Sequence, residues 1–186
     1  MVTVVSGVPR SGTSLMMQML AAGGMELLTD VVRAADADNP RGYFEWEPAK
    51  RLAEAPERIA EAEGKAVKII SSLLMALPPG REYRMLFMHR PMSEVVASQA
   101  EMLRRRGTQG AGLAPAAMAA ALEVHVRQVT AWLEKQPHMR VCHVHHRRLL
   151  QQPEQELDKV LGFLETPLDR AAMLAQIDSS LYRQRR

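Results

Sequence analysis

Short apolar runs alternate with longer helical patterns along the chain. Buried strands are predicted at residues 2–6, 66–70, 84–88 and 140–144. Helices are predicted at residues 12–22, 47–63, 91–104, 153–164 and 168–177, with a long helix that follows the Gly-rich loop 107–112 and ends near residue 136. Strands separated by helical connections predict an α/β fold: a parallel sheet with helices on both faces, whose ligands bind beyond the carboxyl ends of the strands.

The length and composition fit one globular domain. The chain has 186 residues, of which 47% are hydrophobic and 24% charged, and a single core keeps growing up to about 250 residues. We therefore predict one domain over residues 1–186. No apolar stretch reaches the ~18 residues typical of a membrane span, and residues 1–10 show no signal-peptide pattern. With Cys142 as the single cysteine, no intramolecular disulfide can form, and we expect a cytoplasmic protein.

Arginine dominates the positive charge. The formal net charge is +3, and 19 of the 24 basic residues are arginine. Guanidinium groups suit bidentate contacts with phosphate or sulfate oxyanions, whereas a coding bias towards Arg and Ala would give the same excess without a ligand. Aromatic residues make up 4% of the chain, which is too few for extensive stacking on bases, so we predict no nucleic-acid partner.

A glycine-containing loop, GVPRSGTS from Gly7 to Ser14, lies between the first predicted strand and the first predicted helix. Backbone N–H groups of such a loop can surround an oxyanion at the positive end of the helix. The loop matches the nucleoside-triphosphate pattern G-x-x-x-x-G-K-[ST], except that Thr13 replaces the lysine. Because that lysine serves the β and γ phosphates, its absence argues against triphosphate hydrolysis, and Arg10 can supply charge to a shorter diphosphate-like group. A turn without a ligand is the alternative.

From Pro9 to Leu15 the chain resembles the sulfotransferase family, whose 5′-phosphosulfate loop reads P-[KR]-S-G-T-[ST] before an apolar helix. The longer run GVPRSGTSLMMQML is similar to tyrosylprotein sulfotransferases and their bacterial relatives. The resemblance implies a compact P-loop sheet flanked by helices. It also implies transfer of a sulfuryl group from 3′-phosphoadenosine 5′-phosphosulfate (PAPS) to a hydroxyl or amine, without a metal ion. The loop residues that it assigns to this donor are Pro9, Arg10, Ser11, Gly12, Thr13 and Ser14.

The third predicted strand carries a second part of the expected donor site. The resemblance implies an Arg directly after this strand and a Ser eight residues later for the 3′-phosphate, which here are Arg90 and Ser98. The spacing is also sensible without the family, because Pro91 suits a first helical position and Ser98 lies on the same helix face.

Residues 143–164 resemble the family's strand, turn, Pro and amphipathic helix. Where members commonly have an acidic pair, this chain has Arg147 and Arg148. The C-terminal G-x-x-G-x-x-K loop of cytosolic members has no counterpart in the sequence. The tail is nevertheless basic, and Arg183, Arg185 and Arg186 can either contact a phosphate or lie in solvent.

Sulfuryl transfer needs a cation at the leaving oxygen and a base at the acceptor. Lys68, at the end of the second predicted strand, matches a family lysine in the first role; the alternative is a surface lysine at a strand end. Cytosolic members have a histidine two residues later, where this chain has Ile70. Asp30 and Glu45 are therefore the candidate bases, with solvated acids as the alternative for both. Asp30 is one place out of register with tyrosylprotein sulfotransferases, in a segment that we expect to be solvated, whereas Glu45 lies in an RGYFE stretch similar to bacterial members and is expected to open a helix.

Three histidines, His143, His145 and His146, follow one another closely around the end of the fourth predicted strand. Two of them share a strand face, but neither a cysteine nor a third clear ligand is nearby. We therefore predict half-buried strand residues and no metal site.

The acceptor and the oligomeric state stay open at the level of sequence. Three function classes remain: a small sulfotransferase, a relative that binds the nucleotide without turnover, and a P-loop kinase of a small metabolite. Magnesium dependence would distinguish the kinase, and nucleotide binding without turnover would identify the inactive relative.

Overall fold

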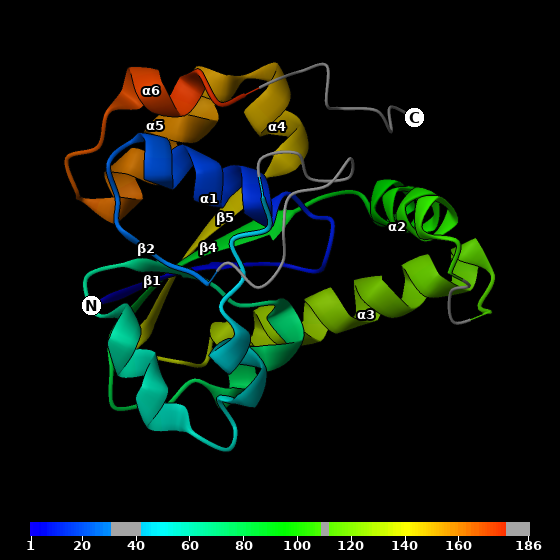
Figure 1. Cartoon of the computed structure of the whole chain (residues 1–186), viewed down its shortest axis with the longest axis horizontal. Helices are drawn as coiled ribbons and strands as arrows, with labels where there is room; N and C mark the ends of the chain where they lie inside the picture. The colour runs from blue at the N-terminus through cyan, green and yellow to red at the C-terminus, as the bar shows by residue number, and fades with distance from the viewer. Residues whose placement is uncertain (31–41, 109–111, 178–186) are drawn as a thin grey trace.

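A parallel sheet of five strands, in the order β2-β3-β1-β4-β5, forms the centre of the molecule (Figure 1). The computed structural model describes residues 1–30, 42–108 and 112–177. Its strands are β1 (Val2–Ser6), β2 (Leu27–Leu28), β3 (Ala66–Lys68), β4 (Tyr83–His89) and β5 (Met139–His145). Every pair of neighbouring strands is parallel, with β1 between β3 and β4. The predicted α/β class is confirmed.

Helices cover both faces of the sheet (Figure 1). One face carries α1 (Thr13–Ala22), α4 (His146–Gln151), α5 (Pro153–Leu164) and α6 (Arg170–Leu174). The other carries α3 (Pro115–Leu133) and three 3₁₀ helices: η1 (Glu47–Arg51), η2 (Pro56–Ala62) and η3 (Ser71–Ala76). The remaining helix, α2 (Met92–Arg106), packs against α3.

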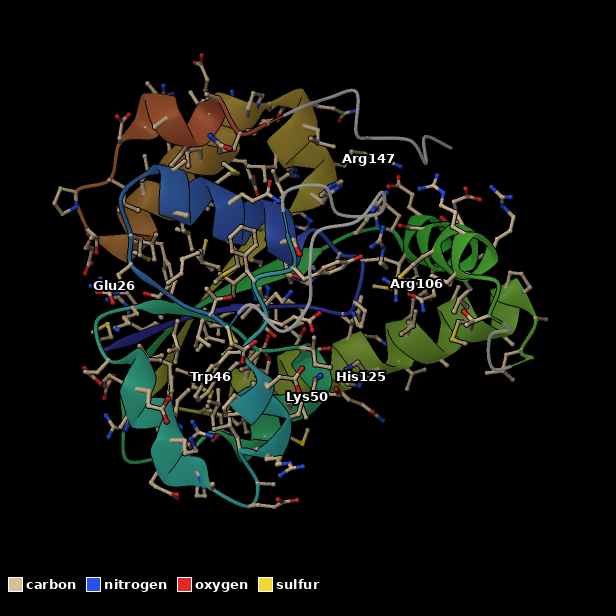
Figure 2. All side chains as sticks on the ribbon, viewed as in Figure 1. Glu26, Trp46, Lys50, Arg106, His125 and Arg147 are labelled. Atoms are coloured by element: carbon tan, nitrogen blue, oxygen red, sulfur yellow. The ribbon has the colours of Figure 1, made fainter. Side chains whose placement is uncertain are left out.

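The two layers of core arise from side-chain alternation along the strands. Val4 contributes to the core with Trp46, which Figure 2 labels in the layer of the 3₁₀ helices. Val5, the next residue, contributes to the opposite core with Met16 of α1. All of β1 is buried, as expected for a central parallel strand covered on both faces. Burial of one such apolar side chain stabilises the fold by about 1.5–3 kcal/mol, which holds the strand ends in a defined position.

Most predicted elements agree with the structure to within three residues at their ends. Three were not predicted. The strand β2 has two residues, too few for a recognisable alternation, and α4 follows β5 without a break. The third, η3, follows β3 closely. Gln152, with φ −136° and ψ 57°, separates α4 from α5, because the residue before Pro153 is disfavoured from helical geometry.

The single helix predicted over residues 47–63 is wrong. Two 3₁₀ helices, η1 and η2, occupy this segment. Pro56 lies in its middle and cannot donate a helical hydrogen bond, and Ala55 before it adopts φ −136° and ψ 66°. Ala49 of η1 and Ile59 of η2 are both buried in the core on this face of the sheet.

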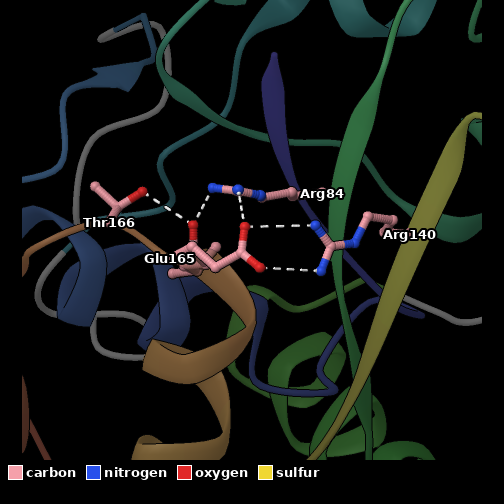
Figure 3. Close-up of polar contacts among 5 residues, drawn as sticks. Arg84, Arg140, Glu165 and Thr166 are labelled. Carbon is pink, nitrogen blue, oxygen red and sulfur yellow. Dashed lines mark hydrogen bonds and ion pairs between the residues drawn. The ribbon is translucent and has the colours of Figure 1, made fainter.

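An ion-pair cluster ties α5 to the edge of the sheet where β4 and β5 begin (Figure 3). Arg84 donates to the carboxylate of Glu165 at 2.6 Å and to the carbonyl of Leu164. Arg140 donates to the same carboxylate at 3.3 Å. These hydrogen bonds, those of Arg140 foremost, lower the pKa of Glu165. Because this edge is opposite the carboxyl ends of the strands, the cluster has a structural role.

Among the described residues, no helix combines the length and the apolar character needed to cross a membrane. Most of the predicted polar stretch 29–42, part of the Gly-rich loop 107–112 and the tail with Arg183, Arg185 and Arg186 lie outside the described residues.

Candidate active site

The residues predicted to bind a ligand follow the carboxyl ends of three neighbouring strands. The loop from Gly7 to Ser14 follows β1, Lys68 ends β3, and Arg90 follows β4. The strands are paired in parallel register, with Val5 opposite Lys68. The loop, the lysine and the arginine therefore lie at one edge of the sheet.

Two positions in the loop require glycine. A Cβ atom at Gly7 would lie 2.5 Å from Ser11 Oγ and 2.7 Å from the carbonyl oxygen of Met88. Gly12 begins α1 with φ 104°, and a Cβ there would lie 2.6 Å from Cδ2 of His146. No side chain fits at such distances, so the loop lies directly against β4 and the start of α4.

The other predicted loop residues differ in their exposure. Pro9 is exposed, whereas Ser11 is buried and its N–H donates to the carbonyl of Val8 at 3.1 Å. The buried Ser11 therefore stabilises the turn of the loop through its backbone hydrogen bond. Thr13 and Ser14 form the first turn of α1, where backbone N–H groups have no acceptor within the helix. This turn can present N–H donors to an anion at the loop.

Hydrogen bonds bring Arg10, Ser98 and Arg90 together. Arg10 adopts φ 71°, and its Nε donates to Oγ of Ser98, on α2, at 3.0 Å. Nη1 of Arg90 donates to the carbonyl oxygen of Arg10 at 3.1 Å. Hydrogen bonds thus join the loop after β1 to the residues at the end of β4 and on α2.

A buried carboxylate that we did not predict positions Arg90. Glu94, whose side chain is 1% exposed, accepts from Nε of Arg90 at 3.0 Å and from Nη2 of Arg147 at 2.6 Å. Removal of one partner from such a buried pair typically costs about 3–5 kcal/mol, because the other charge is left uncompensated. The signal in the sequence was the spacing of four residues between Arg90 and Glu94, which places both on one helix face.

Lys68 is buried at the end of β3, so the alternative of a surface lysine is wrong. Its Nζ donates to the carbonyl oxygen of Tyr43. Oγ of Ser14 also donates to this oxygen, at 3.4 Å, and the Tyr43 hydroxyl accepts from Nη2 of Arg106 at 3.2 Å. The segment at Tyr43 therefore lies beside the loop, the lysine and the end of α2; Figure 2 labels Arg106.

The two candidate bases lie on adjacent segments. The N–H of Asp30 and the hydroxyl of Thr29 donate to the carbonyl of Glu45, at 2.9 Å and 3.0 Å. Oδ2 of Asp30 accepts from the N–H of Glu47 at 2.6 Å, which stabilises the start of η1. The expected solvation of Asp30 is wrong, because the side chain is half-buried and Oδ1 is buried. The helix also starts at Glu47, two residues after the position expected from Glu45.

Lys50, on η1, belongs to the same acidic neighbourhood. Its hydrogen bond to Glu47 raises its pKa, with further contributions from the charges of Glu47, Glu45 and Asp30. An exposed cation therefore lies near both candidate carboxylates, and Figure 2 labels Lys50 on η1.

The clustered histidines differ in burial: His143 is half-buried on β5 as predicted, whereas His145 at the end of β5 is exposed, and His146 is buried and begins α4. Nε2 of His89 lies 2.8 Å from Nδ1 of His143, and the rings of His89 and His145 stack with centroids 5.2 Å apart. Burial, followed by the charges of His143 and His145, lowers the pKa of His89 to about 4. Burial likewise lowers the pKa of His146 to about 4. Within the described part of the chain, no group of His, Cys, Asp and Glu has the arrangement of a metal site.

One further pair at this edge was not predicted. Ser71 follows β3, its N–H donates to the carbonyl of Gly7 at 3.0 Å, and its Oγ lies 2.9 Å from Nε2 of His125 on α3. Figure 2 labels His125 on α3. No local pattern predicts this contact, since the two residues are 54 positions apart.

Comparison with known proteins agrees with this architecture. Residues 2–185 match a family model described as the sulfotransferase domain. No curated protein matches the chain at the level of sequence.

Two solved structures share the fold. The sulfotransferase domain from the curacin biosynthetic pathway is 14% identical, with a TM-score of 0.54 over 97% of this chain and 78% of that one. The sulfotransferase domain from the Synechococcus PCC 7002 olefin synthase is 13% identical, with a TM-score of 0.55 over 100% of this chain and 82% of that one. A sugar kinase from Janibacter sp. HTCC2649 is 17% identical, with a TM-score of 0.46 over 91% of this chain and 96% of that one.

At these identities the two sulfotransferase structures establish the fold, and the family model extends over nearly the whole sequence. The resemblance noted at the glycine loop is thereby confirmed. The chain belongs to the sulfotransferase family and is a transferase.

Proposed function

We propose that the protein transfers a sulfuryl group from PAPS to a hydroxyl or amine acceptor. One observation carries this proposal: Arg10, in the loop, is hydrogen-bonded to both Ser98 and Arg90. The predicted sites for the 5′-phosphosulfate and for the 3′-phosphate are thus parts of one connected unit. A nucleotide with anionic groups on both sides of its ribose suits such a unit.

The loop is suited to the 5′-phosphosulfate. N–H groups of the first turn of α1, the hydroxyl of Ser14 and the guanidinium of Arg10 are the donors proposed for its oxygens. The side chain of Ser11 is enclosed by the loop, so we assign it to shaping the loop. Arg90 and Ser98 are assigned to the 3′-phosphate.

Positioning and charge stabilisation supply most of the acceleration in this type of transfer. The bond between sulfur and the 5′-phosphate oxygen breaks while a bond forms from sulfur to the acceptor oxygen or nitrogen. We assign Lys68 to the negative charge that grows on the leaving phosphate oxygen. We assign the acceptor proton to a carboxylate, with Glu45 preferred to Asp30 because Asp30 already caps η1.

Two alternatives remain distinguishable by experiment. A P-loop kinase of a small metabolite would bind ATP with magnesium, although Thr13 occupies the position of the usual lysine. A relative without turnover would bind the nucleotide through Arg10 and Arg90 and release no product.

Thermal unfolding with nucleotides tests the donor. After transfer of its sulfuryl group, PAPS becomes 3′-phosphoadenosine 5′-phosphate (PAP). PAP at 100 times its dissociation constant is expected to raise the Tm of the protein by about 5–10 °C without magnesium. ATP with magnesium is expected to give a much smaller shift at the same concentration. A larger shift with MgATP would support the kinase instead.

The Arg90→Ala variant tests the 3′-phosphate assignment. It is expected to weaken PAP binding about tenfold or more, because a charge-assisted hydrogen bond contributes about 1.5–3 kcal/mol. Binding of adenosine 5′-phosphosulfate, which lacks the 3′-phosphate, is expected to change far less. Isothermal titration of both ligands gives the comparison, and equal weakening would assign Arg90 to folding, through its pair with Glu94.

A further inference from the structure

A backbone carbonyl lies where two side chains that are proposed to bind the nucleotide meet. Nζ of Lys68 donates to the carbonyl oxygen of Tyr43, and Oγ of Ser14 donates to the same oxygen at 3.4 Å. These are the groups assigned above to the leaving phosphate oxygen and to the 5′-phosphosulfate. Two hydrogen-bond donors that point at one carbonyl oxygen can also share one oxygen of an anion. The carbonyl of Tyr43 therefore occupies a position that the 5′ group of the nucleotide needs.

The carbonyl belongs to residues 42–46, which we call the strap because they pass from one layer of the core to the other. Phe44 packs against the core on the side of α1, and Trp46 is buried in the core on the side of the 3₁₀ helices. The side chain of Tyr43 is also buried, and its hydroxyl accepts from Nη2 of Arg106, the last residue of α2, at 3.2 Å. Figure 2 labels Trp46 and Arg106. Both layers and α2 therefore hold the strap beside the glycine loop.

The backbone on both sides of Tyr43 has left-handed geometry. Gly42 has φ 94°, and Phe44 has φ 52°. Glycine adopts such angles freely, but they are rare and unfavourable for a bulky residue such as phenylalanine. Strain of this kind persists only where surrounding contacts impose it, and it is typical of ligand clamps and switch regions. The contacts of the Tyr43 carbonyl thus help to hold Phe44 in an unfavourable conformation, which movement of the strap would relieve.

We propose that the strap is autoinhibitory: the carbonyl of Tyr43 competes with the 5′ group of the nucleotide for Lys68 and Ser14, and binding of the nucleotide displaces it. This inference rests on the proposed function. An anionic oxygen accepts stronger hydrogen bonds from an ammonium group than a neutral carbonyl does, and release of the strain at Phe44 acts in the same direction. The carbonyl of Glu45 has separate hydrogen bonds, so the displacement ends at Phe44.

Isothermal titration of Phe44→Gly and Phe44→Ala with PAP tests the strap. Both variants lose the ring, but only glycine removes the strain of the left-handed backbone, so Phe44→Gly stabilises the strap in its present conformation relative to Phe44→Ala. PAP is therefore expected to bind about threefold more weakly to Phe44→Gly than to Phe44→Ala. Adenosine 3′-phosphate lacks the 5′ group and does not compete with the Tyr43 carbonyl. It is expected to bind the two variants equally.

Tyr43→Phe is expected to have the opposite effect on PAP binding. This variant keeps the ring but loses the hydrogen bond from Arg106, which loosens the strap. PAP is expected to bind it about two- to fivefold more tightly than the wild type, with adenosine 3′-phosphate unchanged. Tyr83→Phe is the matched control, because the Tyr83 hydroxyl also bonds a single group, the carbonyl of Pro78 at 3.0 Å, but at the opposite edge of the sheet. It is expected to bind both nucleotides like the wild type.

The possible outcomes separate the strap from the proposed function. Equal PAP affinities of Phe44→Gly and Phe44→Ala, or PAP binding to Tyr43→Phe that is no tighter than to the wild type, would overturn autoinhibition and leave the proposed function intact. Wild-type protein that binds PAP no better than adenosine 3′-phosphate would overturn the assignment of the 5′ group to the loop, and the strap with it. Melting curves of the unliganded variants show whether each one is folded.

Discussion

Replacement of Lys68 by methionine is expected to lower turnover by about 10²–10³-fold, the usual loss when a donor to a developing negative charge is removed. The lysine is buried at the end of β3, and its Nζ contacts the carbonyl of Tyr43, to which Ser14 of the loop also donates. Its ammonium group is therefore held beside the loop that is proposed to bind the transferred group. Methionine has a similar volume and fills the space without a charge.

The measurement is the release of PAP from PAPS, with a phenol or amine that the wild-type protein sulfates. PAP affinity is expected to change little in Lys68→Met, because the lost interaction strengthens only as the leaving group gains charge. Lys65→Met is the matched control, since Lys65 precedes the same strand but pairs with Glu26 at 2.6 Å. Full turnover in Lys68→Met would reduce the role of the lysine to anchoring Tyr43.

The parts of the site that could be predicted depend on contacts close in sequence. The glycine loop needs a strand before it and a helix after it, and both are visible in the apolar pattern of residues 2–22. Arg90 and Ser98 lie within one helix and its start, so their spacing alone places them near each other. Glu94 shares this helix and was predictable by the same argument.

The parts that could not be predicted depend on contacts between distant residues. Arg147 is 53 positions from Glu94, and Lys68 meets a backbone carbonyl, which leaves no signature in the type of side chain at position 43. The charged, Ala-rich segment 47–63 has the composition of an α-helix, yet Pro56 and contacts with the sheet divide it into two 3₁₀ helices. Pro56 was therefore a local signal against one continuous helix, whereas the 3₁₀ geometry of both pieces could not be predicted from composition.

The second large loss of turnover is expected when the proposed general base, Glu45, is replaced. Glu45→Gln is expected to lower turnover by about 10²-fold, the contribution of a general base, and to leave PAP affinity nearly unchanged. The carbonyl of Glu45 is held by Asp30 and Thr29. Two residues earlier, the carbonyl of Tyr43 is held by Lys68. This short segment is thus anchored on both sides of Phe44, which fixes the backbone that carries Glu45.

Asp30→Asn is the matched comparison, because it removes a neighbouring carboxylate with little change of shape. Oδ2 of Asp30 accepts from the N–H of Glu47, so this variant is expected to lose about 1 kcal/mol of stability and to keep most of its turnover. Turnover is measured with the same acceptor as for Lys68→Met, and stability is measured by a melting curve, so the two effects are separated. Loss of turnover in Asp30→Asn, with full turnover in Glu45→Gln, would exchange the two roles. Full turnover in both would mean that the acceptor loses its proton without a carboxylate from this segment.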